Sequence, residues 1–134
     1  MIPKFRAWNT FHNKWVKHFY ITENGLIYNM QQPHRDLIGA VPIEKSGLVV
    51  MQSTGLCDKN GKEIFEGDVV VVYDELNEFE PEVYEIVYSQ DNLAWIFYDN
   101  ESHDFYLIST CTWDELEIIG NAHQNPELLE VNND

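Results

Sequence analysis

The most direct chemical signal in the sequence is a row of carboxylates in residues 74–85, which read DELNEFEPEVYE. Glu78, Glu80 and Glu82 occupy alternate positions. On an extended chain, alternate side chains share one face at a spacing of about 6–7 Å. Carboxylates at this spacing can imitate a nucleic-acid backbone and occupy the basic surface of a DNA-binding protein. The alternative is a solvated acidic loop that maintains solubility. We predict a binding site for a basic partner protein at Glu78, Glu80, Glu82 and Glu85.

The charges of the chain are segregated along the sequence. All eight Lys and Arg residues lie at or before Lys62, and the segment up to that residue has a net charge of +4. Residues 63–134 contain nineteen acidic residues and no Lys or Arg, which brings the 134-residue chain to −15. The carboxylates of the second half must therefore face water, a metal, the N-terminal segment or a basic partner. The same polarity would permit head-to-tail self-association into a homo-oligomer.

The basic N-terminal segment offers an alternative function. Basic residues interleaved with aromatic rings can hold single-stranded nucleic acid by stacking and phosphate contacts. The excess of negative charge on the rest of the chain repels a polyanion, which makes nucleic acid an unlikely partner. The residues of this alternative site are Lys4, Arg6, Lys14, Lys17, Trp8 and Trp15.

The stretch TGLCDKNGKEIFEGDVV, residues 54–70, could be taken for an ion or nucleotide loop. A calcium loop starting at Asp58 needs glycine at its sixth position and glutamate at its twelfth, but the twelfth is Val69. A phosphate-binding loop needs four residues between its glycines and a hydroxyl residue after the lysine. Here five residues separate Gly55 from Gly61, and Glu63 follows the lysine. Both templates fail, so the stretch is predicted to be a hairpin.

The histidines and cysteines of the sequence are not predicted to form an active site. Zinc ligands usually come in closely spaced pairs, and a cysteine within a strand is more often a small buried hydrophobe than a nucleophile. We therefore predict no catalytic residue, no metal site and no cofactor. The residues considered are His12, His18 and His34 as metal ligands, and His103 with Asp104 beside Cys57 or Cys111 as a nucleophilic site.

Period-two patterns between turn signals predict a mainly β protein. Asn24-Gly25 and Asn60-Gly61 are expected to be tight hairpin turns, and Gly55 and Gly67 to mark bends. The stretch PEVYEIVYSQDNLAWIFYD, residues 81–99, should form a long hairpin that turns near residues 90–92. Asn125 and Pro126 are placed to cap and start a short C-terminal helical turn. The fold class is a small antiparallel, SH3-like barrel at 48–134 with an N-terminal β-hairpin region at 1–47, packed together as one compact unit.

Three blocks of the sequence resemble the YopX family of phage and prophage proteins of Gram-positive bacteria. They are KFRAWN near the N-terminus, MQSTGLCDKNGKEIFEGDVV in the middle and IIGNAHQNPELL near the end, in the order of the family pattern. Ser53 and Cys57 depart from it, standing where an aromatic and a charged residue are common. The resemblance implies a mainly β protein with no established enzymatic activity, and it supplies no catalytic residues. Because the N-terminus lacks a secretory signal, we expect a cytoplasmic location in the bacterial host.

Overall fold

A computed structural model of the chain describes residues 4–30, 41–73, 81–108 and 116–130. The protein is mainly β, as predicted, and its strands pair antiparallel throughout the described sheets. The chain forms two compact units. Unit 2 is Phe5–Met51, and unit 1 comprises Met1–Lys4 and Gln52–Asp134. The boundary falls inside one long strand, a few residues beyond the predicted division at 47/48.

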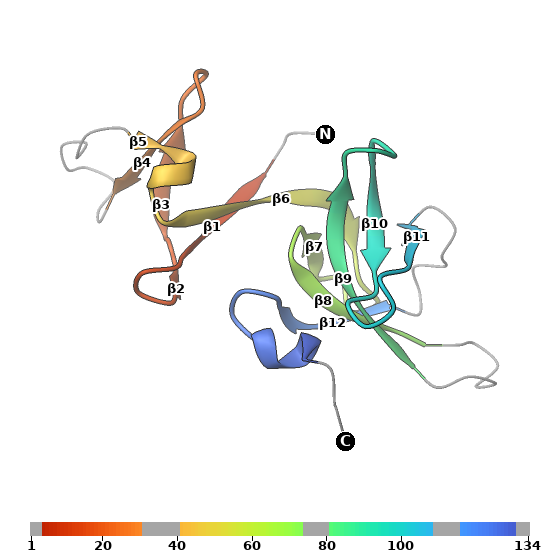
Figure 1. Cartoon of the computed structure of the whole chain (residues 1–134). Coiled ribbons are helices and arrows are strands. Elements are labelled where there is room, and N and C mark those ends of the chain that lie inside the picture. The colour runs from red at the N-terminus through yellow and green to blue at the C-terminus, as the bar shows by residue number, and fades with distance from the viewer. Residues whose placement is uncertain (1–3, 31–40, 74–80, 109–115, 131–134) are drawn as a thin grey trace. The chain divides into compact units, whose positions relative to one another are not determined.

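Unit 2 consists mainly of short strands (Figure 1). It has a small apolar core. Ala7, Ile27 and Leu48 form this core, with Val16 and Phe19 packed against it. The hairpin predicted at Asn24-Gly25 is present, and Gly25 adopts a φ of 79° at its turn. The elements are β1 (Phe5–Asn9), β2 (Lys14–Trp15), β3 (His18–Ile21), β4 (Leu26–Met30), β5 (Val41–Pro42), η1 (Ile43–Lys45) and the start of β6 (Leu48–Cys57).

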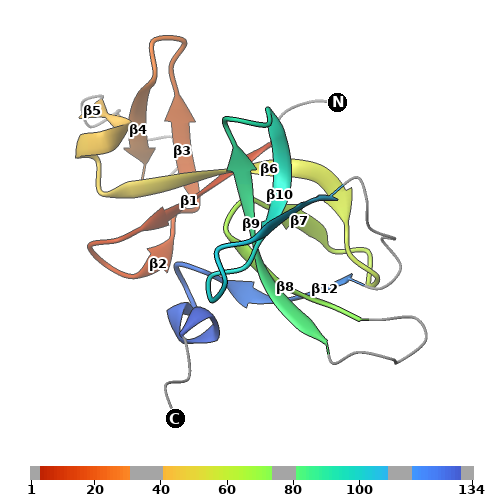
Figure 2. The ribbon, with the colours of Figure 1, turned by 45° about the vertical axis from the view of Figure 1, so that its right-hand side comes forward.

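Unit 1 contains a five-stranded antiparallel sheet in the order β11-β10-β9-β8-β12, which curves into a half-barrel (Figures 1 and 2). The strands β8 to β11 follow one another as a meander, and β12 returns to pair with β8. Its further elements are β7 (Glu63–Phe65), β8 (Asp68–Val72), β9 (Glu82–Ser89), β10 (Ala94–Tyr98), β11 (Phe105–Leu107), β12 (Leu116–Asn121) and η4 (Pro126–Leu129).

The core of unit 1 lies against the inner face of this sheet. Strands β8, β9, β10 and β12 contribute buried side chains to it, and so does β7. Alternation along β9 directs Tyr84 and Ile86 inward, and Phe97 of the neighbouring strand is fully buried beside them. Tyr84 and Phe97 pack with their ring centroids 5.6 Å apart. The buried members of the cluster are Ile64, Val70, Tyr84, Ile86, Phe97, Ile108 and Leu116.

The stretch of residues 54–70 is a hairpin, as predicted. The end of β6 and β7 pair antiparallel, and Asn60-Gly61 forms the turn between them, with Gly61 at a φ of 80°. The pairing register shifts between Ser53 and Cys57, so Gly55 lies in a bulge. Gly67 lies at the bend between β7 and β8. Backbone geometry alone therefore accounts for the glycines of this stretch.

The C-terminal segment forms one 3-10 turn, η4, but Asn125 does not cap it as predicted. The side chain of Asn125 makes no bond to the turn, and its Oδ1 accepts a hydrogen bond from the N–H of Asn121 at 3.2 Å instead. A Cβ atom at Gly120 would lie 2.7 Å from Asn125 Oδ1 and 2.6 Å from Leu128 Cδ1. The absence of a side chain at Gly120 thus leaves the space in which Asn125 and η4 pack against β12.

In the part of the chain that the structure describes, no helix is long and apolar enough to cross a membrane.

Candidate functional site

The predicted row of carboxylates is only partly within the described structure. Glu78 and Glu80 lie outside the described residues, whereas Glu82 and Glu85 belong to β9. Glu82 accepts a hydrogen bond from the hydroxyl of Tyr84, which lies on the same face of the strand. Glu85 is three positions away and therefore lies on the opposite face. The row predicted from the alternation of Glu78, Glu80 and Glu82 therefore does not extend to Glu85, because an odd spacing along a strand reverses the side-chain direction.

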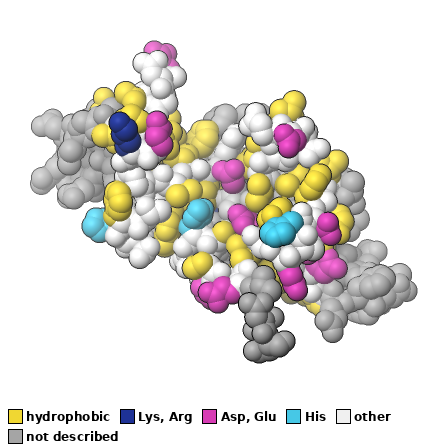
Figure 3. Space-filling view, viewed as in Figure 1, with side chains coloured by type: hydrophobic (Ala, Val, Ile, Leu, Met, Phe, Trp, Pro, Cys, Tyr) yellow, Lys and Arg dark blue, Asp and Glu magenta, His cyan; other side chains and the backbone are white. Residues whose placement is uncertain are grey.

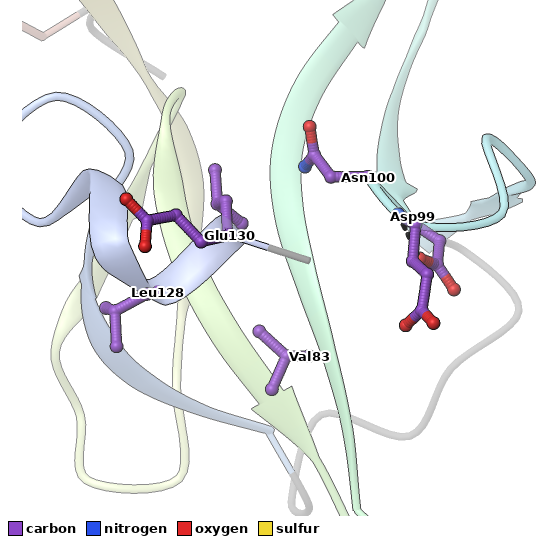
Figure 4. A pocket seen from close by; sticks show the side chains of 7 residues that line it. Val83, Asp99, Asn100, Leu128 and Glu130 are labelled. Carbon is purple, nitrogen blue, oxygen red and sulfur yellow. Dashed lines mark hydrogen bonds between the residues drawn. The ribbon is translucent and has the colours of Figure 1, made fainter. Parts of the chain in front are cut away.

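Glu85 lies near a pocket on the outer side of β9. Its Oε1 accepts a hydrogen bond from Asn100 Nδ2 at 3.3 Å, and Asn100 lines the pocket. The pocket has a volume of about 240 Å³ and lies between β9, the loop after β10 and η4 (Figure 4). Its lining residues are Val83, Asp99, Asn100, Glu101, Leu128, Leu129 and Glu130.

The loop that forms one wall of the pocket is held by Asp99. Asp99 Oδ1 accepts hydrogen bonds from the N–H of Glu101 at 2.9 Å and the N–H of Ser102 at 3.3 Å. The N–H of Glu101 is the main cause that lowers the pKa of Asp99, and the N–H of Ser102 and the nearby His103 lower it further against a smaller opposing effect of burial. Asp99 is therefore a carboxylate at neutral pH and contributes a fixed negative charge to the wall.

A second perturbed carboxyl group lies beside Glu85. Burial raises the pKa of Glu66, and the negative charge of Glu85 raises it further, while a backbone hydrogen bond partly opposes both. The charged form of Glu66 is thus disfavoured in the folded protein relative to the unfolded chain. Repulsion between the negative charges of Glu66 and Glu85 therefore disfavours the folded protein when both groups are ionised.

Replacing Glu66 with glutamine should increase the free energy of unfolding at pH 7. Because the folded-state pKa is raised, the folded protein binds the proton more tightly, and stability is lost as pH rises from the ordinary value of 4.5 through the folded-state pKa. Glutamine mimics the protonated group and removes this loss. Urea unfolding at pH 7 and pH 4 measures the effect, and the gain should shrink at pH 4. An equal gain at both pH values would contradict the assignment.

The charge of unit 1 extends beyond the pocket. Unit 1 holds three lysines and twenty acidic residues, a net charge of −17. Lys4 Nζ lies 3.4 Å from Glu63 and Lys59 Nζ lies 3.2 Å from Glu117, both in partly exposed positions. Most carboxylates of the unit therefore have no lysine of the same unit to pair with. On the face shown in Figure 3, acidic side chains are spread over this unit and no lysine or arginine is visible among them.

Comparison with known families identifies the chain. Residues 4–130 match the family described as YopX protein, which covers nearly all of the sequence. The chain belongs to the YopX family. Comparison with curated protein sequences finds no match.

Two solved structures are similar to this YopX-family protein over almost their whole length. The protein EF1440 from Enterococcus faecalis is 28% identical, with a TM-score of 0.62 over 97% of this chain and 99% of its own. The protein yopX from Bacillus subtilis is 20% identical, with a TM-score of 0.64 over 94% of this chain and 97% of its own. The second likeness shows the fold alone.

The residues of the alternative nucleic-acid site are divided in this YopX-family protein. Lys4 belongs to unit 1, where it pairs with Glu63, and the others belong to unit 2. Trp8 is only 6% exposed and packs edge-on against Trp15, and the guanidinium of Arg6 lies 4.6 Å from the Trp15 ring centroid. The ring of Trp8 is therefore not available to stack on a base, and Arg6 covers one face of Trp15. Lys14 and Lys17 are exposed.

The remaining candidate groups are placed as follows. His103 Nδ1 lies 2.7 Å from the hydroxyl of Tyr98, and the thiol of Cys57 is exposed and free. His12 and His18 lie in unit 2, and His34 and Cys111 lie outside the described residues. Within the described ranges, no three His, Cys, Asp or Glu residues are grouped so as to hold a metal ion.

The acidic pocket was not predicted from the sequence. The acid-rich turn DNESHD and the terminal run PELLE were visible signals, but each resembles an ordinary solvated segment. Their meeting at Val83 depends on the β8–β12 pairing, which joins residues about 50 positions apart and carries no local signature.

Proposed function

We propose that this YopX-family protein is a non-enzymatic phage or prophage accessory protein that binds a basic protein partner through the carboxylates of unit 1. The observation that supports this most is the net charge of −17 on a unit that holds three lysines. Such a surface raises the association rate with a positively charged protein and repels nucleic acid. Exposed carboxylates keep their hydration in the free protein. They lose it only when a basic surface covers them.

The bacterial setting of the proposal rests on relatives. The two similar solved structures come from Enterococcus faecalis and Bacillus subtilis. We propose that the protein works in the cytoplasm of a bacterial host and that its basic partner is a host or phage protein.

We further infer that the five-stranded sheet of unit 1 is an SH3-like barrel. A four-strand meander from β8 to β11 followed by a fifth strand that pairs with the first is the order expected when a small sheet begins to close on itself. Ile86 and Phe97 are fully buried in its interior. Binding is therefore expected on the outer surface and the loops rather than inside the barrel.

The proposal predicts a salt-sensitive protein partner. The variant E82Q/E85Q removes two carboxylates on opposite faces of β9 and should weaken retention of a host protein in a pull-down at low salt. The matched control E23Q/E44Q changes the net charge equally but alters unit 2. Retention should fall as salt rises from 50 to 500 mM, because screening shortens the reach of charges to a few Å.

Two results would contradict the proposal. One is that no protein is retained in a salt-dependent manner. The other is that E23Q/E44Q reduces retention as much as E82Q/E85Q does, since then only net charge would matter. Light scattering at the same salt concentrations measures whether the retained partner is a second copy of the chain, which the charge segregation also permits.

A further inference from the structure

The pocket of unit 1 combines an apolar wall with carboxylates on its rim. We propose that it binds the side chain of a lysine presented by the basic partner protein. This inference rests on the proposed function and specifies where the partner is held and by which chemical group. The occupant is an alkyl chain that ends in an ammonium group.

The apolar wall suits the stem of such a side chain. Val83 is 40% exposed on the outer face of β9 and lies in Figure 4 between η4, which carries Leu128, and the loop that carries Asp99 and Asn100. Leu129 completes the apolar part of the lining. The methylene groups of a lysine readily bury against such a surface while the charged end remains at the rim. Covering Val83 would also remove an exposed apolar side chain from water.

The rim supplies the charge complement. Asp99 and Glu101 belong to the loop after β10, and Glu130 follows η4 on the other side of Val83. The N–H groups of Glu101 and Ser102 fix the Asp99 carboxylate in position before any ligand arrives. Neither Glu101 nor Glu130 makes a side-chain hydrogen bond or ion pair with the described part of the chain. An incoming cation therefore breaks no side-chain interaction that these two groups make with the described part of the chain.

The composition of the pocket favours lysine over arginine. Arginine gains most where a planar guanidinium stacks on an aromatic ring or meets one carboxylate through two parallel bonds. Among the described residues, no aromatic side chain lines this pocket, and its carboxylates come from two separate walls. An ammonium group is a compact charge with three donors that can point in different directions. A neutral alkyl chain would pack against the apolar wall but would leave the carboxylates without a cation.

The test is an NMR titration of the ¹⁵N-labelled protein with N-acetyl-lysinamide, and with N-acetyl-norleucinamide as a probe that lacks the charge. The lysine probe should shift the amide signals of Val83, Asn100, Glu101 and Leu129 with one saturable curve. The norleucine probe should not. In E101Q/E130Q the dissociation constant for the lysine probe should rise about 3- to 10-fold, the range expected from two partly exposed ion pairs. The control E23Q/E44Q should leave it unchanged.

Several results would overturn the inference. These are shifts that never saturate, equal shifts with norleucinamide, and equal weakening in E23Q/E44Q. Loss of a dimer in light scattering of E101Q/E130Q would also overturn it, because the occupant would then be a second copy of the chain. If the lysine probe does not bind but the salt-sensitive partner is still retained, the pocket assignment alone fails. If the probe binds but no partner is retained, the proposed function alone fails.

Discussion

Replacing Asp58 with alanine is expected to lower the free energy of unfolding by about 3–5 kcal/mol, because a buried carboxylate that accepts several backbone hydrogen bonds is lost. Asp58 Oδ1 accepts from the N–H groups of Asn60 and Lys62, each at 2.9 Å. Asp58 Oδ2 accepts from the N–H of Ile118 at 3.0 Å. The first two bonds shape the hairpin turn, and the third joins that turn to β12 across sixty residues.

The loss should be large because one side chain accepts from three separate backbone N–H groups. The side chain is 7% exposed, so water reaches the site poorly. The N–H of Ile118 lies at the irregularity in the β8–β12 pairing between Ile118 and Gly120, where the ladder itself does not satisfy every group. Asp91→Ala is the control, since Asp91 is an exposed acid of the β9–β10 turn and its removal changes the net charge equally. An equal loss in both variants would show that charge, not hydrogen bonding, is responsible.

The same site has a predictable pH dependence. Partial burial acts to raise the pKa of Asp58, but the N–H groups of Ile118, Lys62 and Asn60 together lower it below the ordinary value of 3.8. A lowered folded-state pKa adds stability that is present above that ordinary value and is lost as pH falls through the folded-state pKa. Urea unfolding of the wild type and Asp58→Asn should therefore differ at pH 7 and converge as the pH falls below about 3.8.

Local chemistry explains which parts of the fold were predictable. The turns at Asn24-Gly25 and Asn60-Gly61 were predicted because Asn and Gly adopt the positive φ values that tight turns need. Gly55 and Gly67 are predicted at bends because a glycine within a strand pattern marks a bulge or bend, and both have positive φ. Each of these predictions depends on a few adjacent residues and on backbone geometry that tertiary packing does not change.

The errors arose where a partner from another part of the chain decided the outcome. Asn125 is a residue type that often caps helices, but its side chain accepts a hydrogen bond from the N–H of Asn121 instead. This bond is possible because Gly120 has no side chain to occupy the space beside Asn125. The pocket needs Val83, the loop after β10 and η4 to meet, and no short-range pattern specifies that meeting.

Replacing Asn121 with alanine should lower the free energy of unfolding by about 2–4 kcal/mol, because it takes a hydrogen-bond donor from a buried carboxylate. Asn121 Nδ2 donates to Asp68 Oδ1 at 3.3 Å, and both residues are 2% exposed. Asp68 Oδ2 also accepts from the N–H of Phe65 at 2.8 Å, which holds the bend at Gly67. Asn121 Oδ1 accepts from the N–H of His123 at 2.9 Å, so the same side chain shapes the chain that leads to η4.

A double-mutant cycle separates this interaction from the loss of packing. Asp68→Ala and Asn121→Ala should each destabilise the protein, and the double variant should lose less than the sum by about 1–3 kcal/mol, the range measured for groups in direct contact. Asp68→Ala combined with Glu117→Ala is the control, since the two residues lie several positions apart along the β8–β12 ladder and should add independently. Coupling near zero for Asp68 and Asn121 would mean that this side-chain contact adds nothing to the backbone ladder and the apolar packing that join β8 and β12. A strong coupling would mean that this contact stabilises the end of β12, from which the chain leads to η4 and one wall of the acidic pocket.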